Sequence, residues 1–153
     1  MPSPLKIRHA NPADLSTLLD LYAQLSPDNA LLPSAAAKAI FAQIARYEGS
    51  AILLGEVDET IVASCTVIVI PNLTRGGRPY ALIENVITDA DHRRRGYANL
   101  LLDAATTQAW EHGCYKVMLM TGTREPATLA VYQRAGFEQS KTGFQKRRLP
   151  KRQ

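Results

Sequence analysis

The chain has 153 residues, of which 46% are hydrophobic and 21% are charged. This length suits one domain with a substantial core, and the composition is that of a globular protein, which excludes a disordered or fibrous chain. The formal net charge is +4, and much of the excess lies in Arg93–Arg95 and in the tail Lys146–Arg152. Such clustering favours an anionic partner such as a nucleotide cofactor, although a tail of this kind is more often simply solvated.

Cysteine usage and hydropathy indicate a cytoplasmic protein. Cys65 and Cys114 lie within apolar stretches, where they are expected to be small core residues rather than part of a disulfide framework. The longest strongly apolar run, Ile61–Ile70, is too short to span a bilayer, and the N-terminus lacks an export signal. We therefore expect no membrane association.

The N-terminal part of the chain predicts one strand and two helices. Alternation over Leu5–Arg8 indicates the strand. A helix should begin near Asn11, which can cap it, with Asp14 in the position of a capping-box acid. Pro27–Asp28 should end that segment, and a second helix is expected over roughly Ser34–Tyr47.

The middle of the chain predicts a hairpin and a loop. Two strands, Ala51–Val57 and Ile61–Ile70, are joined by the short polar turn Asp58–Thr60. The glycine- and arginine-containing segment Pro71–Pro79 is typical of an exposed loop. It is either a connector or, alternatively, a lid or acceptor-binding loop. A further strand follows it, Tyr80–Thr88.

The stretch from Leu82 to Gly113 carries the strongest indication of function. A strand ends at the acidic turn 89–91, and after Arg93–Arg95 a helix begins that Gly113 ends. The first turn of a helix presents unpaired backbone N–H groups and the positive end of the helix dipole, which together suit a phosphate. Gly96 allows close approach of the backbone, and the arginines add positive charge. The predicted ligand is a pyrophosphate.

The C-terminal part predicts a buried strand over Tyr115–Met120 and a helix that begins at Pro126 and stops at Gly136. Two short strands should follow, the first from Phe137 and the second around Gly143–Arg148. The resulting element order predicts a mixed sheet with helices on its faces, an α/β (α+β) fold. We expect a single domain over residues 1–153 with a basic tail from about residue 149, since no repeat or linker is present.

Two motifs in this order resemble those of the GNAT superfamily of N-acetyltransferases. Arg93-x-x-Gly96-x-Ala98, after a strand and at the start of a helix, is similar to the family's Gln/Arg-x-x-Gly-x-Gly/Ala signature, and Tyr132-x-x-x-Gly136-Phe137 resembles its Tyr-x-x-x-Gly-Phe. With the element order, the resemblance covers nearly the whole chain. It implies the acyl-CoA N-acyltransferase fold, whose mostly antiparallel sheet splays between its fourth and fifth strands. Acetyl-CoA would enter that gap.

The resemblance also implies how the cofactor is held. The backbone N–H groups of Arg94–Asn99 would hold the pyrophosphate, with Arg93 as the leading residue of the signature. The backbone of Val86–Thr88 would pair with the pantetheine arm like an added strand and leave one N–H near the thioester oxygen. The cofactor-binding residues implied in this way are Val86, Ile87, Thr88, Arg93, Arg94, Arg95, Gly96, Tyr97, Ala98 and Asn99.

Two residues are candidates for catalysis. The resemblance implies Tyr132 as the general acid that protonates the departing CoA thiolate, whereas helical spacing alone would make it a core aromatic. Glu84, a carboxylate on an otherwise apolar strand, is a candidate general base; alternatively it forms a structural salt bridge, and water serves as the base. Glu125 stands where many relatives carry asparagine, which puts an asparagine contact to CoA in doubt. No metal site is predicted, because metal-ligand spacing is absent around the three histidines, His9, His92 and His112.

The expected activity is direct transfer of an acetyl group from acetyl-CoA to a primary amine in a ternary complex, without an acyl-enzyme. The acceptor, a small-molecule or peptide amine, is not determined, because the regions that would select it are Leu25–Tyr47, Pro71–Pro79 and the C-terminal strands. One alternative is a non-catalytic acyl-CoA-binding or sensing module. A nucleic-acid-binding protein is a second and weaker alternative, since no zinc spacing or recognition helix is present. The oligomeric state stays open, with a homodimer as one alternative.

Overall fold

The computed structural model describes residues 3–26 and 31–150. The predicted helix end at Pro27–Asp28 lies outside the described residues, and so do Lys151 and Arg152 of the basic tail. The chain divides into two compact units, Met1–Leu119 and Met120–Gln153. The expectation of a single domain over residues 1–153 stays a prediction.

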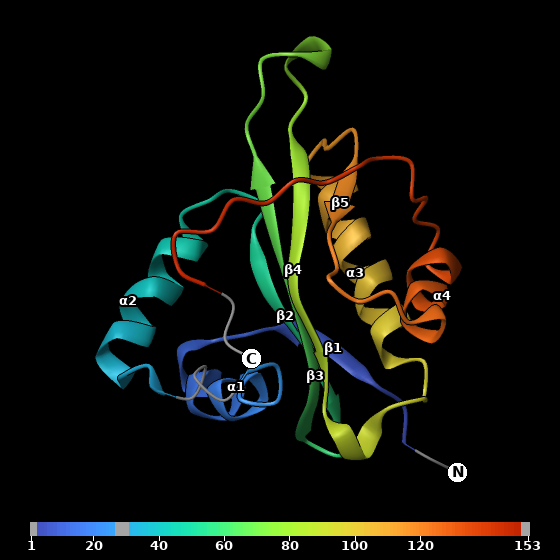
Figure 1. Cartoon of the computed structure of the whole chain (residues 1–153). Helices are drawn as coiled ribbons and strands as arrows, with labels where there is room; N and C mark the ends of the chain where they lie inside the picture. Colours follow the sequence, from blue (N-terminus) through green and yellow to red (C-terminus); the bar gives the residue numbers. More distant parts are fainter. Residues whose placement is uncertain (1–2, 27–30, 151–153) are drawn as a thin grey trace. The chain divides into compact units, whose positions relative to one another are not determined.

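The first unit is built on a five-stranded sheet in the order β1-β2-β3-β4-β5 (Figure 1). Neighbouring strands are antiparallel from β1 to β4, and β5 runs parallel to β4. This confirms the predicted mixed, mostly antiparallel sheet. The strands are β1 (Lys6–His9), β2 (Ala51–Val57), β3 (Thr60–Ile70), β4 (Tyr80–Thr88) and β5 (Val117–Leu119).

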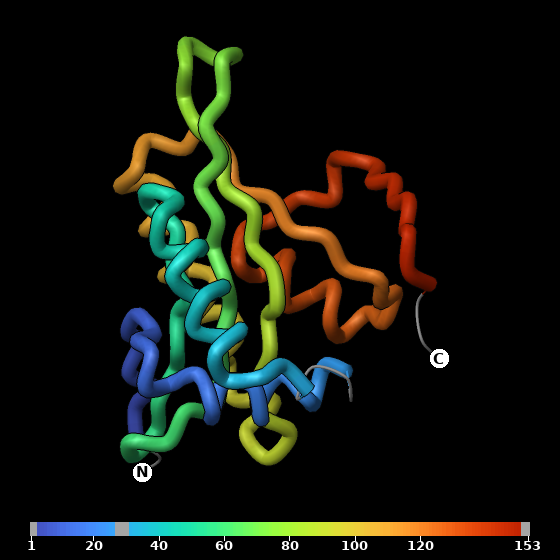
Figure 2. The backbone as a smooth tube through the Cα atoms, turned by 90° about the vertical axis from the view of Figure 1, so that its left-hand side faces the viewer, coloured from blue at the N-terminus to red at the C-terminus, as the bar shows by residue number. Residues whose placement is uncertain are grey.

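Helices cover both faces of this sheet, as the two views in Figures 1 and 2 show. On one face lie α1 (Leu15–Tyr22) and α2 (Ser34–Ala45), and on the other lies α3 (Tyr97–Glu111). Apolar side chains of these helices pack against both faces of the sheet. The core under α1 and α2 contains Leu15, Leu18, Ala37, Ile52 and Leu54, and the buried side chains of α3 include Leu101, Leu102, Ala105 and Ala109.

Local turn chemistry explains why the predicted hairpin forms. Asp58 and Glu59 both adopt positive φ, at 49° and 64°. Two-residue turns with positive φ at both positions match the twist of antiparallel strands, and acidic or amide side chains tolerate this conformation better than branched ones. The turn therefore brings β2 alongside β3, with pairs from Val57 and Thr60 to Ala51 and Val67.

The second unit contains one helix, α4 (Pro126–Arg134), which the sequence predicted from the proline at its start and the glycine after its end. The two predicted strands from Phe137 and around Gly143–Arg148 are wrong, because none of the residues from 137 to 150 is in a strand. Most side chains there are polar and exposed, and Phe144 is 92% exposed. Without alternating apolar residues, such a segment has no face to bury in a sheet.

A partly buried ionic cluster joins the first strand to the first helical turn. Both guanidinium nitrogens of Arg8 donate to the carboxylate of Asp14 at 2.8 Å, and the same arginine donates to Glu56 of β2. Asp14 also accepts from the backbone N–H of Asn11, which completes the predicted capping box. The hydrogen bonds from Arg8 hold the pKa of Asp14 below its ordinary value.

Replacing Asp14 with asparagine should lower the free energy of unfolding at neutral pH by about 2 kcal/mol, because charge-assisted hydrogen bonds are lost. The lowered pKa means that the carboxylate stabilises the fold fully above its ordinary pKa of about 4 and ceases to do so as the pH falls through the native value. Denaturant unfolding of wild type and Asp14→Asn from pH 7 to pH 2 should show the difference vanish in acid. Asp20→Asn, at an exposed position on α1, is the control, and an equal loss in both variants would contradict the assignment.

Candidate active site

Strand β4 contains a bulge at its centre. Thr66 of β3 pairs with Glu84 while Ser64 pairs with Ile87, so β4 carries one residue more than β3 between these pairs. Asn85 lies in the bulge with φ of 54°, a left-handed conformation that asparagine tolerates better than most residues. Bulges are common beside active sites, since they change the direction of the side chains and N–H groups around them.

The two strands of the predicted gap pair over only three positions. The pairing of β4 with β5 begins at Ala81 and Val117 and ends at Ile83 and Leu119. From Glu84 onward β4 has no partner on this side among the described strands. The predicted separation of the fourth and fifth strands is therefore present, and it leaves a strand edge with backbone groups to which an extended ligand could bind.

Glu84 lies on the face of the sheet that α1 and α2 cover. It is directly opposite Thr66, which itself is opposite Ile52 of the core under those helices. The Glu84 side chain is exposed, and it forms no ion pair within residues 3–26 and 31–150. The alternative of a structural salt bridge is thus not found in this part of the chain.

The acidic turn after β4 is fixed by side-chain hydrogen bonds. The Asp89 carboxylate accepts from the amide nitrogen of Gln24 at 2.8 Å, from Nδ1 of His92 at 2.7 Å and from the backbone N–H of Asp91 at 3.2 Å. The Gln24 carbonyl oxygen in turn accepts from the N–H of Ala90 at 2.9 Å. The bonds from Gln24 and His92 hold the pKa of Asp89 below its ordinary value.

The segment between this turn and α3 presents a run of free backbone donors. Arg94 and Gly96 have φ of 63° and 79°, and the latter is the N-cap of α3. In the described part of the chain, none of the six backbone N–H groups of Arg94–Asn99 donates to a protein acceptor. A Cβ at Gly96 would meet nothing within 4 Å, so space is open beside the backbone. Such a segment can surround an anion with N–H groups.

Two of the three arginines of this segment form hydrogen bonds to nearby backbone carbonyls. Arg93 Nε donates to the carbonyl of Thr88 at 3.3 Å, and Arg95 donates to the carbonyl of Asp91 at 3.2 Å. All three arginine side chains are exposed, whereas Tyr97 is buried and belongs to the core. Tyr97 could therefore contribute to a cofactor site through its backbone but not through its ring.

Tyr132 lies on α4 in the second unit and is half-buried. Burial raises the pKa of its hydroxyl above the ordinary value, while a hydrogen bond with Thr121 of the same unit lowers it by a smaller amount. A hydroxyl of this kind is protonated throughout the neutral range and could donate a proton to a thiolate, whose conjugate acid has a pKa near 8.5.

The three histidines form hydrogen bonds within the protein, and both cysteines are buried. His9 hydrogen-bonds to the side chain of Gln108, His92 to Asp89, and His112 to the backbone carbonyl of Gln108. Burial raises the pKa of Cys65 to about 12. Among the described residues no group of three His, Cys, Asp or Glu side chains could hold a metal ion, and no helix there is long and apolar enough to cross a bilayer.

Sequence patterns did not reveal two of the residues that shape this site. Gln24 is 65 residues from its partner Asp89, and a lone glutamine after a helix carries no signal of such a contact. The bulge at Asn85 could have been suspected from an asparagine within a β-branched strand, since asparagine is depleted in strands.

The described geometry is a strand edge followed by a segment of free backbone N–H groups, and sequence comparison identifies the family of the chain. The model of the Acetyltransferase (GNAT) family matches residues 16–137, more than half of the chain. The protein belongs to the GNAT acetyltransferase family. The match confirms the family that the two sequence motifs indicated.

Individual GNAT proteins are similar over almost the full length. The chain is 30% identical over 135 residues to "Glucosamine 6-phosphate N-acetyltransferase" of Trypanosoma brucei brucei, with 87% of this chain and 88% of the relative covered. It is 43% identical to the solved structure of "Putative acetyltransferase from Agrobacterium tumefaciens str. C58", with a TM-score of 0.86 and coverage of 94% and 99%. The aminoglycoside N-acetyltransferase AAC(6')-Iy in complex with CoA shares the fold at 22% identity, with a TM-score of 0.78 and coverage of 97% and 98%.

In this GNAT protein, replacing Asp89 with alanine should loosen the turn after β4. The N–H groups of Ala90 and Asp91 should exchange with solvent about tenfold faster, because hydrogen bonds that each contribute about 1 kcal/mol are lost. Hydrogen exchange followed by NMR measures this effect. Asp91→Ala is the control, since its exposed side chain forms no hydrogen bond in the described part of the chain, and unchanged exchange in Asp89→Ala would contradict the role of the carboxylate.

Proposed function

We propose that the protein transfers an acetyl group from acetyl-CoA to a primary amine by direct attack in a ternary complex. The observation that carries this proposal is the run of six backbone N–H groups, Arg94–Asn99, that have no protein acceptor in the described part of the chain and follow the unpaired edge of β4 after the Asp89 turn. Family membership supports the reaction class, and the similarity to a glucosamine 6-phosphate N-acetyltransferase supports an amine as the acceptor.

Coenzyme A would bind along this edge and turn. The N–H groups of Arg94–Asn99 would donate to the pyrophosphate, and the arginines 93–95 would add positive charge around it. The pantetheine amides would pair with the backbone of Val86, Ile87 and Thr88, much as an added strand does. A CoA complex of a protein with the same fold supports acetyl-CoA as the donor substrate.

The reaction forms a C–N bond between the amine and the acetyl carbon and breaks the C–S bond of the thioester. A backbone N–H of β4 beside the bulge would donate to the carbonyl oxygen as negative charge develops there, a kind of contact that typically contributes about 3 to 4 kcal/mol. The bulge at Asn85 supports this role, because it interrupts regular pairing where such a donor is needed.

Two proton transfers complete the reaction. The attacking amine must lose a proton, and we assign this step to Glu84, acting directly or through water, because its exposed carboxylate lies next to the bulge. The departing thiolate must gain a proton, and we assign this step to Tyr132 on the basis of its motif and its protonated hydroxyl. No metal is required for either step.

The proposal treats residues 1–153 as one cytoplasmic acetyltransferase domain. The family match supports this, since residues 16–137 cross the boundary between the two compact units. A non-catalytic acyl-CoA sensor on the same fold would bind the cofactor without releasing thiol in the presence of amines. A nucleic-acid-binding protein would show salt-dependent binding to DNA or RNA that acetyl-CoA does not alter.

Titration calorimetry with acetyl-CoA, followed by thiol release with a panel of amines, tests the function. The wild-type protein should bind acetyl-CoA and release thiol with at least one amine. Gly96→Val should bind acetyl-CoA at least tenfold more weakly, because a branched side chain disfavours φ near 79° and occupies the space beside the backbone donors. Gly113→Val is the matched control, since that glycine at the other end of α3 also has positive φ and open surroundings. Absence of binding heat in folded wild-type protein would refute the proposal.

Replacing Tyr132 with phenylalanine should lower kcat about 10²-fold and leave the affinity for acetyl-CoA unchanged, because the general acid is lost but no binding contact is. In wild type, activity should fall only as the pH rises through the raised pKa of this hydroxyl, above its ordinary value near 10, and the variant should lack that decline. Steady-state thiol release from pH 6 to pH 11 measures both effects. An identical rate and pH profile in the two proteins would show that Tyr132 is not the acid.

A further inference from the structure

A cluster of cationic and aromatic side chains lies where the β3–β4 loop meets the start of β5, and we call it the basic patch. Lys116 Nζ lies 5.5 Å from the ring centroid of Tyr80 and 5.4 Å from that of Tyr115, and the Arg75 guanidinium lies 5.6 Å from the latter ring. Arg78, whose side chain is exposed, adds a further positive charge to the same loop. These cation–π contacts orient the charges but leave their donors available.

The loop that carries the two arginines has a defined conformation. The Asn72 side chain donates to the carbonyls of Thr74 and Arg78, both at 3.2 Å, and to the hydroxyl of Thr74 at 2.9 Å. Arg75 adopts φ of 56°, which is uncommon for a residue other than glycine. Hydrogen bonds within the loop therefore hold Arg75 in a strained conformation, and strained residues of this kind are found preferentially at binding sites.

The basic patch has no carboxylate partner in the protein. The ion pairs among residues 3–26 and 31–150 involve only Arg8 and His92 as cations. Arg75, Arg78 and Lys116 are therefore not neutralised by an acid within the described part of the chain. Like charges that are held close together without counter-charges create a positive potential that attracts an anionic ligand.

The basic patch and Glu84 lie on the same face of the sheet. Tyr80, Leu82 and Glu84 alternate along β4 before the bulge, and their β3 partners alternate in the same way. Lys116 lies beside Tyr80 because Val117 pairs with Ala81 in the parallel register. Glu84 follows Tyr80 by four steps along the strand, a backbone distance of about 13 Å. The proposed pyrophosphate site lies beyond the opposite end of β4.

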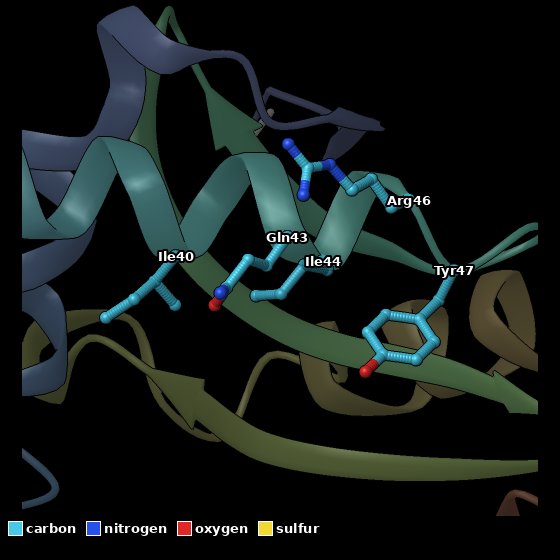
Figure 3. Close-up of a pocket in the computed structure, with 5 residues that line it drawn as sticks. All are labelled: Ile40, Gln43, Ile44, Arg46 and Tyr47. Carbon is cyan, nitrogen blue, oxygen red and sulfur yellow. The ribbon is translucent and has the colours of Figure 1, made fainter.

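A pocket on α2 and the turn after it adds to this face. It is lined by Ile40, Gln43, Ile44, Arg46 and Tyr47, and Figure 3 shows four of these side chains leaving the helix on the same side. Ile40, Ile44 and Tyr47 give the lining its apolar and aromatic surface. Gln43 adds an amide, and Arg46 is the one charged residue. In Figure 3 the Arg46 side chain points away from the other four, so the pocket contributes mainly apolar contact to this face.

We infer that the acceptor is a peptide amine that carries an anionic group, a carboxylate or a phosphate, about 13 Å from the attacking nitrogen. The inference rests on the proposed function, since it takes the amine to react beside Glu84. The anionic group would lie on the basic patch, and the apolar side chains of the peptide would lie in the α2 pocket. An extended chain covers this distance in about four residues, which is longer than a small monosaccharide amine.

The test uses hexapeptides with a free N-terminal amine and a single acidic residue. Peptides with Asp at position 2, 4 or 6, the matching Asn peptides and a phosphoserine peptide at position 4 are compared by kcat/KM for thiol release. Asp at position 4 should exceed Asn at position 4 by at least fivefold, and the excess should fall with added salt. The phosphoserine arm distinguishes a carboxylate site from a phosphate site.

The variants Lys116→Gln and Arg75→Gln should abolish this preference while leaving acetyl-CoA affinity and turnover of the Asn peptides unchanged. Lys6→Gln is the matched control, because it removes an exposed cation from β1, at the far edge of the sheet from β5. Three results would each overturn the inference. The Asp and Asn peptides could react at equal rates, the preference could survive in both patch variants, or the basic patch could bind an oligonucleotide instead. Thiol release with any amine would still uphold the acetyltransferase proposal, so the two failures are distinguishable.

Discussion

The incomplete pairing of β4 is the constraint on which the rest of the site depends. One edge of this strand is paired with β3 almost throughout, whereas the other edge loses β5 after Ile83. Backbone donors and acceptors that remain unpaired along a strand readily form further hydrogen bonds. Proteins usually cover such an edge or place charged side chains on it. The Asp89 turn, whose own N–H groups are paired, connects this edge to Arg94–Asn99, where the N–H groups again have no protein acceptor in the described part of the chain.

The end of α1 keeps this surface in place. Gln24 follows that helix and holds the Asp89 turn, while Tyr22 of the same helix interacts with the hydroxyls of Ser64 and Thr66 on β3. Burial raises the pKa of Tyr22, so its hydroxyl stays neutral in this polar cluster. A helix that belongs to the core, with the residue that follows it, thus fixes both the strand next to Glu84 and the turn that precedes Arg94–Asn99, so the candidate site needs no rigid loop of its own.

Charge is distributed along β4 in a way that suits a reaction between two ligands. Arginines follow its C-terminal end, the basic patch lies at its N-terminal end, and one exposed carboxylate lies between them. The ionic cluster of Arg8, Asp14 and Glu56 has a different character, because every charge in it is paired and its role is to join β1, β2 and the first helical turn. Paired charges stabilise the fold, and unpaired ones are available for ligands.

What the sequence determined by itself was local. The capping box at Asn11, the turn at Asp58 and Glu59, the glycine before α3 and the helix from Pro126 depend on the conformational preferences of neighbouring residues, and the structure agrees at each of them. The two motifs that indicated the family are equally local. The predicted strands after Phe137 failed because a few aromatic residues in a polar segment do not provide a face that a sheet can bury.

Only the tertiary structure decided which distant residues meet. The contact between Gln24 and Asp89, the exposure of Glu84, the bulge at Asn85 and the meeting of Arg75 with Tyr115 all depend on strand register and helix packing. Register and packing are set by the summed burial of many side chains, so no short pattern encodes them. The sequence therefore determined the local chemistry of the segment Arg94–Asn99, whereas the fold decided what surrounds it.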